Sequence, residues 1–368
     1  MLSTLAPSCN LAPLSNGDAL RQRPRLRDAP SFARLITEAR SFLTPLILAG
    51  DIGGTKTALG LFQGPELGRM RHATYPSRDF GDLERIIRAF LDGTAAPIAA
   101  ACFGVAGVVV DGRVTPTNLP WVVDESTLSN IIPSPQVRLI NDLEAAAWGV
   151  MRLSATDLVS LQEGQRRRGH KALIAAGTGL GEAFIIDDGG RPIVVPSEGG
   201  HADFAPRTDA EAVLLAYLRR EFGHVSYERV LSGPGLLNIY RCLRDTRGRV
   251  EPAWLTERMQ EDDPSAVVTE IGLAGEDPNC AEALDMFVSI YGAEAGNLAL
   301  KVIARGGVYV AGGIAPRIQG KLTDGGFMAA FRDKGRFASL METIPVRLAL
   351  DSDAPLLGAA YVASQIVR

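Results

Sequence analysis

Two segments of this chain share one pattern: an apolar run, a tight loop rich in glycine, and a second run with strand character. They are LILAGDIGGTKTAL (46–59) and ALIAAGTGLGEAF (172–184). Apolar runs joined by a short glycine loop are typical of a β-hairpin. Two such hairpins predict a duplicated fold that presents two facing loops. The alternative is a chance match of two glycine hairpins.

Aligning the two segments predicts which residues occupy equivalent places. Matched on their strands, Gly53 falls on Gly179 and Asp51 falls on Gly177. The chain holds 39 glycines, well above an average of about 7%. They lie mainly in short loops after apolar runs, so these loops are the candidate functional segments.

Outside the hairpins, the chain alternates between strand and helix patterns. Strands are expected over 46–49, 57–62, 71–75, 98–110 and 137–140, and helices over 80–91, from 141 onward, over 210–222 and over 281–305. This alternation predicts the α/β class. The polar stretch 163–170 is expected to be a solvated connection between the two halves, and 261–279 another surface region.

Length and charge exclude several classes of protein. A chain of 368 residues predicts two or three domains. Its 38 basic and 42 acidic side chains give a net charge of −4, which argues against a dedicated nucleic-acid binder. No apolar run reaches the roughly 18 residues of a spanning helix, which excludes an integral membrane protein.

The cysteines and the first 45 residues bear on compartment and processing. Four scattered cysteines without a CxxC pair disfavour a disulfide scaffold or a zinc site and predict a cytoplasmic, reducing location. Residues 1–45 hold six arginines, no lysine and five prolines. We expect a disordered extension or an over-long start, because the acidic residues Asp18, Asp28 and Glu38 speak against a transit peptide.

The first glycine loop has the parts of a phosphate-binding loop. Its glycines would let backbone amides approach phosphate oxygens, its hydroxyls can donate hydrogen bonds and its lysine supplies charge. The residues are Asp51, Gly53, Gly54, Thr55 and Lys56. Asp51, at the end of the strand, could hold Mg²⁺ or its water. The alternative is a plain hairpin turn.

Two further glycine motifs suit a nucleotide. The loop Gly177, Thr178 and Gly179 lacks the GxGxxG spacing of a dinucleotide site, and makes better sense as a second phosphate loop. Gly312 and Gly313 follow an apolar run and would let a flat group such as adenine or ribose approach. Each motif alone is also compatible with an ordinary strand and turn.

Three polar motifs are candidates for catalysis or ligand binding. Asn141 is expected to cap a helix, and Asp142 to face a cleft as a general base, where a plain capped helix start is the alternative. SEGGHADF (197–204) places Glu198, His201 and Asp203 around two glycines, which suits a polyol better than a metal ion. Glu228 is a further carboxylate before a glycine turn, where an ordinary surface charge is the alternative.

In this order and spacing, the motifs resemble those of the bacterial glucokinase family, ATP-dependent hexose kinases of the actin-like sugar-kinase superfamily. The resemblance runs from about residue 46 to the end and is carried by AGDIGGTKTALGLF, TPTNLPW, LINDLEAAAWG, AAGTGLGEA, PSEGGHADFAP and VYVAGGIAPR. It implies an α/β, two-domain, actin-like (ribonuclease H-like, duplicated) fold with an interdomain cleft. The smaller domain would span 46–152 with 350–368, and the larger 153–349.

The resemblance also implies a reaction and a set of site residues. The reaction is transfer of the γ-phosphoryl group of ATP, with Mg²⁺, to the 6-hydroxyl of glucose by a cytoplasmic homodimer. Asp142 would be the catalytic base, and the glucose ligands would be Asn118, Asn141, Asp142, Glu198, His201 and Glu228. The nucleotide contacts would be Asp51, Gly53, Gly54, Thr55, Lys56, Gly177, Thr178, Gly179, Gly312 and Gly313.

One departure and several rivals stand beside this resemblance. Lys56 replaces the asparagine of many family members and is familiar from the related repressor/kinase sugar-kinase family. That family usually carries a zinc cluster with closely spaced cysteines, which this chain lacks. The rivals are a kinase with another hexose or a polyphosphate donor, a non-catalytic actin-like nucleotide-binding protein, and a sugar-responsive transcription regulator. A regulator would need a basic helix-turn-helix, for which 1–45 is too short and proline-rich.

Overall fold

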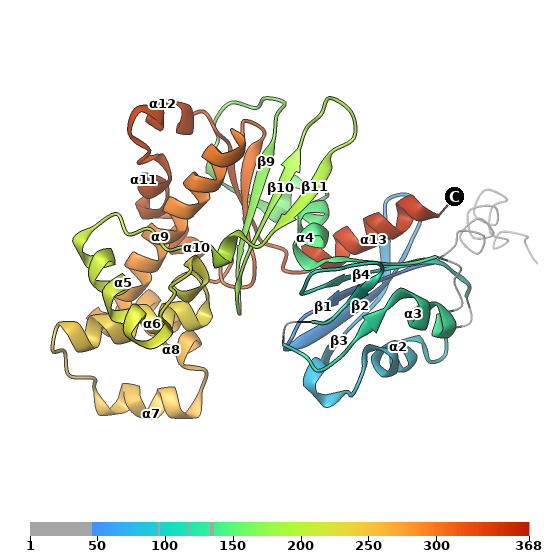
Figure 1. Ribbon diagram of the computed structural model, residues 1–368, viewed down its shortest axis with the longest axis horizontal. Coiled ribbons are helices and arrows are strands. Elements are labelled where there is room, and N and C mark those ends of the chain that lie inside the picture. The colour runs from blue at the N-terminus through green and yellow to red at the C-terminus, as the bar shows by residue number, and fades with distance from the viewer. Residues whose placement is uncertain (1–45, 95, 117, 133–135, 368) are drawn as a thin grey trace, which may run out of the picture. The chain divides into compact units, whose positions relative to one another are not determined.

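A computed structural model describes residues 46–94, 96–116, 118–132 and 136–367 (Figure 1). The extension predicted over 1–45 lies outside these residues. Helices and strands alternate along the described chain, which confirms the α/β class. No helix within the described ranges is both long and apolar enough to span a membrane.

Two sheets hold the described strands, apart from the short pair β5 (Arg113–Val114) and β6 (Val123–Asp124). The first sheet has the order β3-β2-β1-β4-β7. Its strands are β1 (Leu46–Ile52), β2 (Lys56–Gln63), β3 (Gly68–Pro76), β4 (Ile98–Val105) and β7 (Val137–Asn141). β1 therefore extends through Asp51 to Ile52, beyond the predicted end at residue 49, and the loop after it is shorter than the gap between the predicted strands 46–49 and 57–62.

The second sheet repeats this plan. Its order is β11-β10-β9-β12-β13-β8. Its strands are β8 (Leu158–Gln162), β9 (Lys171–Ala176), β10 (Leu180–Ile186), β11 (Ile193–Ser197), β12 (Gly307–Ala311) and β13 (Val346–Ala349). In both sheets an antiparallel hairpin, β1–β2 or β9–β10, lies next to two parallel strands.

Strand register corrects the alignment drawn from the sequence. The last pair of the first hairpin is Ile52 with Thr57, and that of the second is Ala176 with Leu180. Gly53 is therefore equivalent to Gly177, not Gly179. The loops differ by one residue, and an alignment of glycines alone could not locate that difference.

Helices cover both faces of the first sheet. α2 (Leu83–Leu91) and α3 (Glu125–Ile131) pack on one face, where their apolar side chains join those of alternate β1 residues. α13 (Ala354–Ile366) packs on the other face, against β1 and β4. Asp82 caps α2 by accepting a hydrogen bond from the Arg85 amide at 2.9 Å, which is why this helix begins after the predicted residue 80.

The second sheet is also covered on both faces. The long helix α9 (Pro278–Val302) lies on one side, where the Tyr291 hydroxyl donates to the Ala311 carbonyl at 3.1 Å. α4 (Asp142–Val150) packs on the opposite face against β9 and β10. α4 follows a strand of the first sheet and α13 follows a strand of the second, so the helices cross over between the two halves (Figure 1).

Glycines let α4 and α13 approach closely. A Cβ at Gly149 would overlap the Ala354 carbonyl, and a Cβ at Gly358 would overlap the Ala145 carbonyl. Helix–helix contacts this close leave no room for a side chain. The start of α4 is thereby fixed relative to both sheets.

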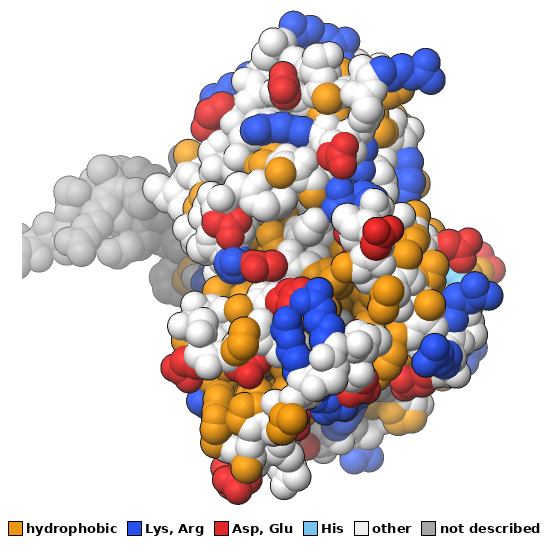
Figure 2. All heavy atoms as spheres, turned by 90° about the vertical axis from the view of Figure 1, so that its left-hand side faces the viewer, with side chains coloured by type: hydrophobic (Ala, Val, Ile, Leu, Met, Phe, Trp, Pro, Cys, Tyr) orange, Lys and Arg blue, Asp and Glu red, His pale blue; other side chains and the backbone are white. Residues whose placement is uncertain are grey.

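The remaining helices pack against α9 or against helices that contact it. They are α5 (Asp209–Phe222), α6 (Gly233–Thr246), α7 (Ala253–Glu261), α8 (Pro264–Ala274), α10 (Gln319–Thr323), α11 (Gly326–Arg332) and α12 (Ala338–Met341). Figure 2 shows that the face turned to the viewer, which lies on the left in Figure 1, mixes basic and acidic side chains. The Arg258–Glu270 ion pair, at 2.7 Å, joins α7 to α8.

Two sequence expectations about connections are wrong. The stretch 163–170 is largely exposed, as expected, but it joins β8 to β9 within the second sheet and does not link the two halves. The region 261–279 contains α8, which buries Val267, Val268 and Ile271, and it is not only surface. Charged residues at both ends of that region favoured a surface interpretation, although a short apolar stripe lies between them.

Candidate active site

Asp51 lies near the end of β1, on the face that α13 covers. Ile47 and Ala49 precede it on that face, because strand side chains alternate. Burial raises the pKa of Asp51 to about 7, with a further contribution from the charge of Asp142, while Lys56 opposes the rise. The structure thus places Asp51 and Asp142, both predicted from the sequence, within electrostatic reach of each other.

The first glycine loop is held by a neighbouring serine. The Gly53 amide donates to the Lys56 carbonyl at 3.0 Å and closes the turn. The hydroxyl of Ser77 donates to the Gly53 carbonyl at 2.8 Å and lies 2.9 Å from the hydroxyl of Thr57. Thr55 and Lys56 stay exposed at the tip, where they are free to meet a ligand.

The predicted sugar ligand Asn118 borders this loop. A Cβ at Gly54 would come within 2.6 Å of the Asn118 Cβ, so only glycine fits without a shift. Asn118 is itself exposed. The structure therefore brings Asn118 next to the first glycine loop.

Asn141 and Asp142 begin α4 as predicted. The side-chain oxygen of Asn141 accepts from the amides of Leu143 at 2.8 Å and Glu144 at 3.3 Å. Its amide nitrogen donates to the Gly107 carbonyl at 3.0 Å, which leaves one N–H for a ligand. The cap thus fixes the backbone from which the next residue, Asp142, projects.

The carboxyl group of Asp142 is partly buried at the N-terminus of α4. Burial raises its pKa to about 6, hydrogen bonds from the backbone oppose this, and the charge of Glu198 adds to the rise. Asp142 accepts a hydrogen bond from the Leu143 amide at 3.0 Å. A carboxylate with this pKa is ionised at neutral pH and basic enough to take a proton from a hydroxyl in a transition state.

Three predicted sugar ligands form a cluster. His201 Nε2 lies 3.9 Å from a Glu198 oxygen, and His201 Nδ1 lies 4.0 Å from a Glu228 oxygen. Glu198 and His201 are well exposed, whereas Glu228 is about one-third exposed. Asp203, from the same motif, is not in this cluster, because its carboxylate pairs with His224 at 2.8 Å.

The second glycine loop is tied to the same cluster. The Gly177 amide donates to the Gly179 carbonyl at 2.8 Å, which closes the three-residue turn. A Glu228 oxygen accepts from the Leu180 amide at 3.0 Å, directly after the loop. Glu228 therefore contacts both a predicted phosphate loop and a predicted sugar ligand.

Gly312 and Gly313 lie beside this loop. Gly312 has a φ of +87°, and a Cβ there would overlap the Ala176 carbonyl. That carbonyl accepts a hydrogen bond from the Ile314 amide at 3.2 Å. Gly313 is exposed and open to a ligand.

Glu198 and His201 face a hollow of about 920 Å³. Its opposite wall is the segment from Gly107 to Thr115, which the Asn141 amide contacts at Gly107. A second hollow of about 800 Å³, near Arg168 and Arg305, contains none of the predicted residues. The first hollow is large enough for a sugar, and it adjoins the polar cluster.

The sequence analysis missed residues that support these groups. Ser77, which braces the first glycine loop, precedes α2 with no motif of its own. Glu182 is fully buried on β10 next to the turn of His201, and an acidic residue within an apolar strand was a signal that could have revealed it.

This geometry can be compared with known proteins. A family model described as Glucokinase matches residues 48–366. A glucokinase of Trichormus variabilis is 41% identical over 340 residues, covering 87% of this chain and 99% of its own. The crystal structure of a glucokinase from an Antarctic psychrotroph aligns with a TM-score of 0.76 at 32% identity, covering 87% of this chain and 99% of its own.

A more distant structure shows the same fold with ligands. The ROK family glucokinase of Streptomyces griseus, in complex with glucose and AMPPNP, aligns with a TM-score of 0.61 at 24% identity. The alignment covers 87% of this chain and 99% of that one. This likeness supports the predicted actin-like sugar-kinase fold.

Proposed function

The chain belongs to the glucokinase family, and from that premise we propose that it transfers the γ-phosphoryl group of ATP to the 6-hydroxyl of glucose. The products are glucose 6-phosphate and ADP. The observation that carries this proposal is the cluster of Glu198, His201 and Glu228 beside Asp142. It offers hydrogen-bond acceptors and a donor to a polyol, next to a carboxylate that can act as a base.

Asp142 is the proposed catalytic base. Phosphoryl transfer requires in-line positioning and charge neutralisation more than covalent chemistry. Asp142 accepts the proton of the 6-hydroxyl as the oxygen bonds to the γ-phosphorus and the bond to ADP breaks. Its pKa of about 6 keeps it ionised at neutral pH, so it is ready to accept that proton.

The proposed glucose ligands are Asn118, Asn141, Asp142, Glu198, His201 and Glu228. The carboxylates accept hydrogen bonds from sugar hydroxyls, and the remaining N–H of Asn141 donates one. Because Glu228 also holds the Leu180 amide at 3.0 Å, it couples the sugar site to the second glycine loop.

ATP is the proposed phosphoryl donor, bound by the two glycine loops. The nucleotide ligands we propose are Asp51, Gly53, Gly54, Thr55, Lys56, Gly177, Thr178, Gly179, Gly312 and Gly313. The loop amides and Lys56 neutralise phosphate charge. The γ-phosphate would lie between the two loops, within reach of the 6-hydroxyl.

Asp51 fits a role toward Mg²⁺. It is a carboxylate whose pKa burial and the charge of Asp142 raise to about 7, and a divalent cation would relieve that repulsion. Among the described residues no group of three His, Cys, Asp or Glu could hold a metal, so one carboxylate with ATP oxygens and water is the expected ligand set. The ion would neutralise the charge that develops on the phosphates.

We extend the proposal to organisation and compartment. The residue ranges 46–152 with 350–368, and 153–349, are the proposed small and large domains that close on glucose. Each range contains one of the two sheets, which supports this division. A homodimer and a cytoplasmic location are the proposed states of the protein.

A coupled assay with MgATP tests the function. The purified protein is offered glucose, mannose, fructose and N-acetylglucosamine, and ADP release and sugar phosphate are measured. Turnover that prefers glucose and yields glucose 6-phosphate is expected. Preference for another sugar, or for polyphosphate over ATP, would indicate a related hexose kinase, and ATP binding without turnover on any sugar would indicate an actin-like binding protein.

A further inference from the structure

Glu182 occupies a place where the fold needs an apolar side chain. It pairs with Ile174 in the second hairpin, as Leu59 pairs with Gly50 in the first. Both side chains are fully buried, and Leu59 packs into the core under the first sheet. Since the equivalent position is satisfied by leucine, the carboxyl group of Glu182 is not required to build a hairpin of this kind.

The carboxyl group of Glu182 has no polar partner. Neither of its oxygens has a hydrogen-bond partner among the described residues. An ionised carboxylate buried without a partner costs several kcal/mol, so such a group becomes neutral instead. Burial raises the pKa of Glu182 to about 7, the charge of Glu294 adds to the rise, and Lys301 opposes it.

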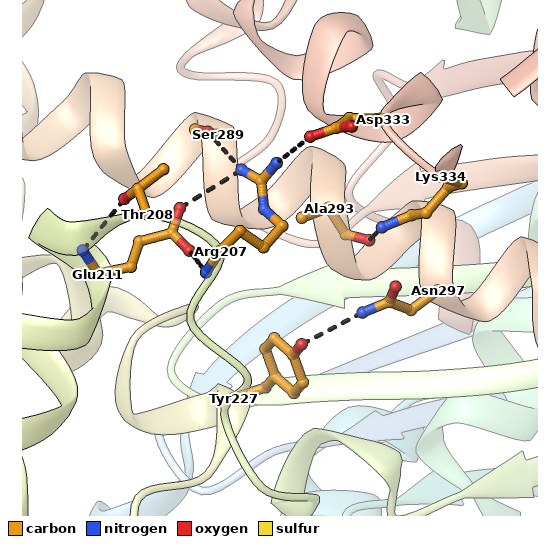
Figure 3. A network of polar contacts seen from close by, with 9 residues as sticks. All are labelled: Arg207, Thr208, Glu211, Tyr227, Ser289, Ala293, Asn297, Asp333 and Lys334. Atoms are coloured by element: carbon orange, nitrogen blue, oxygen red, sulfur yellow. Dashed lines mark hydrogen bonds and ion pairs between the residues drawn. The ribbon is translucent and has the colours of Figure 1, made fainter. Parts of the chain in front are cut away.

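The groups around Glu182 already satisfy one another. The Glu294 carboxylate accepts from Asn297 at 2.8 Å and from Lys301 at 3.2 Å, all on α9. On the side of the turn η4 (Tyr227–Arg229), the Tyr227 hydroxyl accepts from Asn297 at 3.2 Å (Figure 3). Lys301 thus pairs with Glu294, and Glu182 is the buried acid without a polar partner among the described residues.

Glu182 supports the turn that carries the predicted sugar ligands. A Cβ at Gly199 would overlap its Oε2, so the backbone of the turn η3 (Gly199–His201) rests on this carboxyl group. Glu198 precedes this turn and His201 ends it. The Tyr227 amide also donates to the carbonyl of Ala202, just after the turn, at 3.0 Å.

We propose that Glu182, as a neutral carboxylic acid, is a positioning residue that sets the η3 turn and thereby the affinity for glucose. The proposal rests on the proposed function. When Glu182 loses its proton, its carboxylate faces that of Glu294 in a buried space. Repulsion and entering water then displace Gly199, and with it Glu198 and His201, so KM for glucose rises with pH.

The test is the pH dependence of KM for glucose in the wild type and in Glu182→Gln, which keeps the shape and is always neutral. From pH 6.5 to 8.5 we expect the wild-type KM to rise roughly threefold to tenfold, since one unit of pKa difference between free and bound protein is worth a factor of ten. In Glu182→Gln the rise is absent. Glu144→Gln is the matched control. Glu144 is partly buried, whereas Glu182 is fully buried, but burial raises the pKa of both acids. Glu144 lies outside this turn, and its variant keeps the wild-type rise.

The outcomes separate this inference from the proposed function. A wild type that phosphorylates glucose with a flat KM, or a rise that persists in Glu182→Gln, overturns the role of Glu182 alone. A wild type that phosphorylates no sugar at any pH overturns the proposed function, and this inference with it. The carboxyl group of Asp142 also titrates near the sugar, but it is present in all three proteins, so the difference between the variants reports Glu182.

A second pair of variants tests the contact itself. Gly199→Ala would press its methyl group on the carboxyl group of Glu182, and we expect KM at pH 6.5 to rise about tenfold or more. Adding Glu182→Ala makes room, so the double variant should recover most of that loss. A double variant no better than Gly199→Ala would overturn the contact, and thermal unfolding of each variant shows whether it is folded.

Discussion

The two glycine hairpins share a backbone plan but carry their acids on opposite faces. In the first, Asp51 lies on the face toward α13, and its equivalent in the second, Ala175, lies on the face toward α4. On the other face the order is reversed, with Leu59 in the first hairpin and Glu182 in the second. The two hairpins thus share a framework, while single positions decide which face of each sheet carries a buried acid.

The helices α4 and α13, which follow strands of the first and second sheet, also differ in the acid at their start. α4 begins with Asp142, whose neighbour Asn141 caps the helix through two backbone amides. α13 begins after Asp353, which makes no side-chain cap and instead pairs with Arg69 at 2.7 Å. Only the first of these acids lies next to the sugar cluster, so similar positions carry different chemistry.

The largest effect should come from exchanging these two acids for amides. Asp142→Asn removes the proposed base, and general-base catalysis is worth about 10²–10⁴ in rate. We expect kcat to fall by that factor while KM for glucose changes by less than about threefold. Asp353→Asn, the matched control, loses a partly exposed ion pair worth about 0–1 kcal/mol and the smallest of the charges that raise the pKa of Asp51, and it keeps most of kcat. Steady-state kinetics of both variants decide; a retained kcat in Asp142→Asn would exclude it as the base.

The next largest effect is on KM, and it should distinguish the role of Glu198 from that of Glu228. A hydrogen bond to a charged group is worth about 1.5–3 kcal/mol, or roughly tenfold to a hundredfold in KM for glucose when it is lost. Glu198→Gln should raise KM for glucose alone. Glu228→Gln should also raise KM for ATP, because Glu228 holds the Leu180 amide after the second glycine loop. Equal changes in both variants for both substrates would contradict this division of roles.

Local signals in the sequence predicted much of the backbone around the candidate site. The capping pattern at Asn141 predicted Asp142 at the start of a helix, and apolar runs joined by glycine loops predicted both hairpins. These features depend on neighbouring residues, so a sequence can reveal them. The cluster of Glu198, His201 and Glu228 is different, because it joins two turns separated by 26 residues or more, and motif resemblance rather than spacing indicated it.

Other features depend on contacts that the sequence does not display. Equivalence of the hairpins was misjudged by two residues, because loop length is set by pairing across the strands. An acidic residue within an apolar strand was the one sign of Glu182, but its burial comes from α9 and from the turn at Gly199, which the sequence does not show. The sequence likewise gave no reason to expect that Gly149 and Gly358 are contact points between two helices.

These two glycines allow a stability test of the contact between α4 and α13, to which each helix contributes one glycine. In Gly358→Ala the new methyl group would overlap the Ala145 carbonyl, and forcing an extra carbon into a packed contact costs about 1–3 kcal/mol. Gly149→Ala, its counterpart on α4, should cost a similar amount. Gly320→Ala in α10 meets no atom within 4 Å and serves as the control, expected to be neutral or slightly stabilising. Urea unfolding measures all three, and a Gly358→Ala protein as stable as the control would show that the contact is not tight.

The smallest expected effect concerns the pH dependence of kcat/KM that Asp142 causes. Below a pH of about 6, Asp142 is protonated and cannot act as a base, so kcat/KM should fall as the pH decreases through that value. Burial is the main cause of the raised pKa of Asp142, and the charge of Glu198 adds to it. Glu198→Gln should therefore move this fall to lower pH, by less than about one unit.

Glu228→Gln is the control for that shift, since Glu228 is not among the groups that set the pKa of Asp142. Titration of Asp51 near pH 7 should be seen in both variants, and the comparison removes it. A fall that moves equally in both variants would mean that the sugar cluster acts on the base through structure and not through charge. If the pH at which kcat/KM falls shifts only in Glu198→Gln, the charge of Glu198, from the second half of the fold, raises the pKa of Asp142, which follows the first sheet.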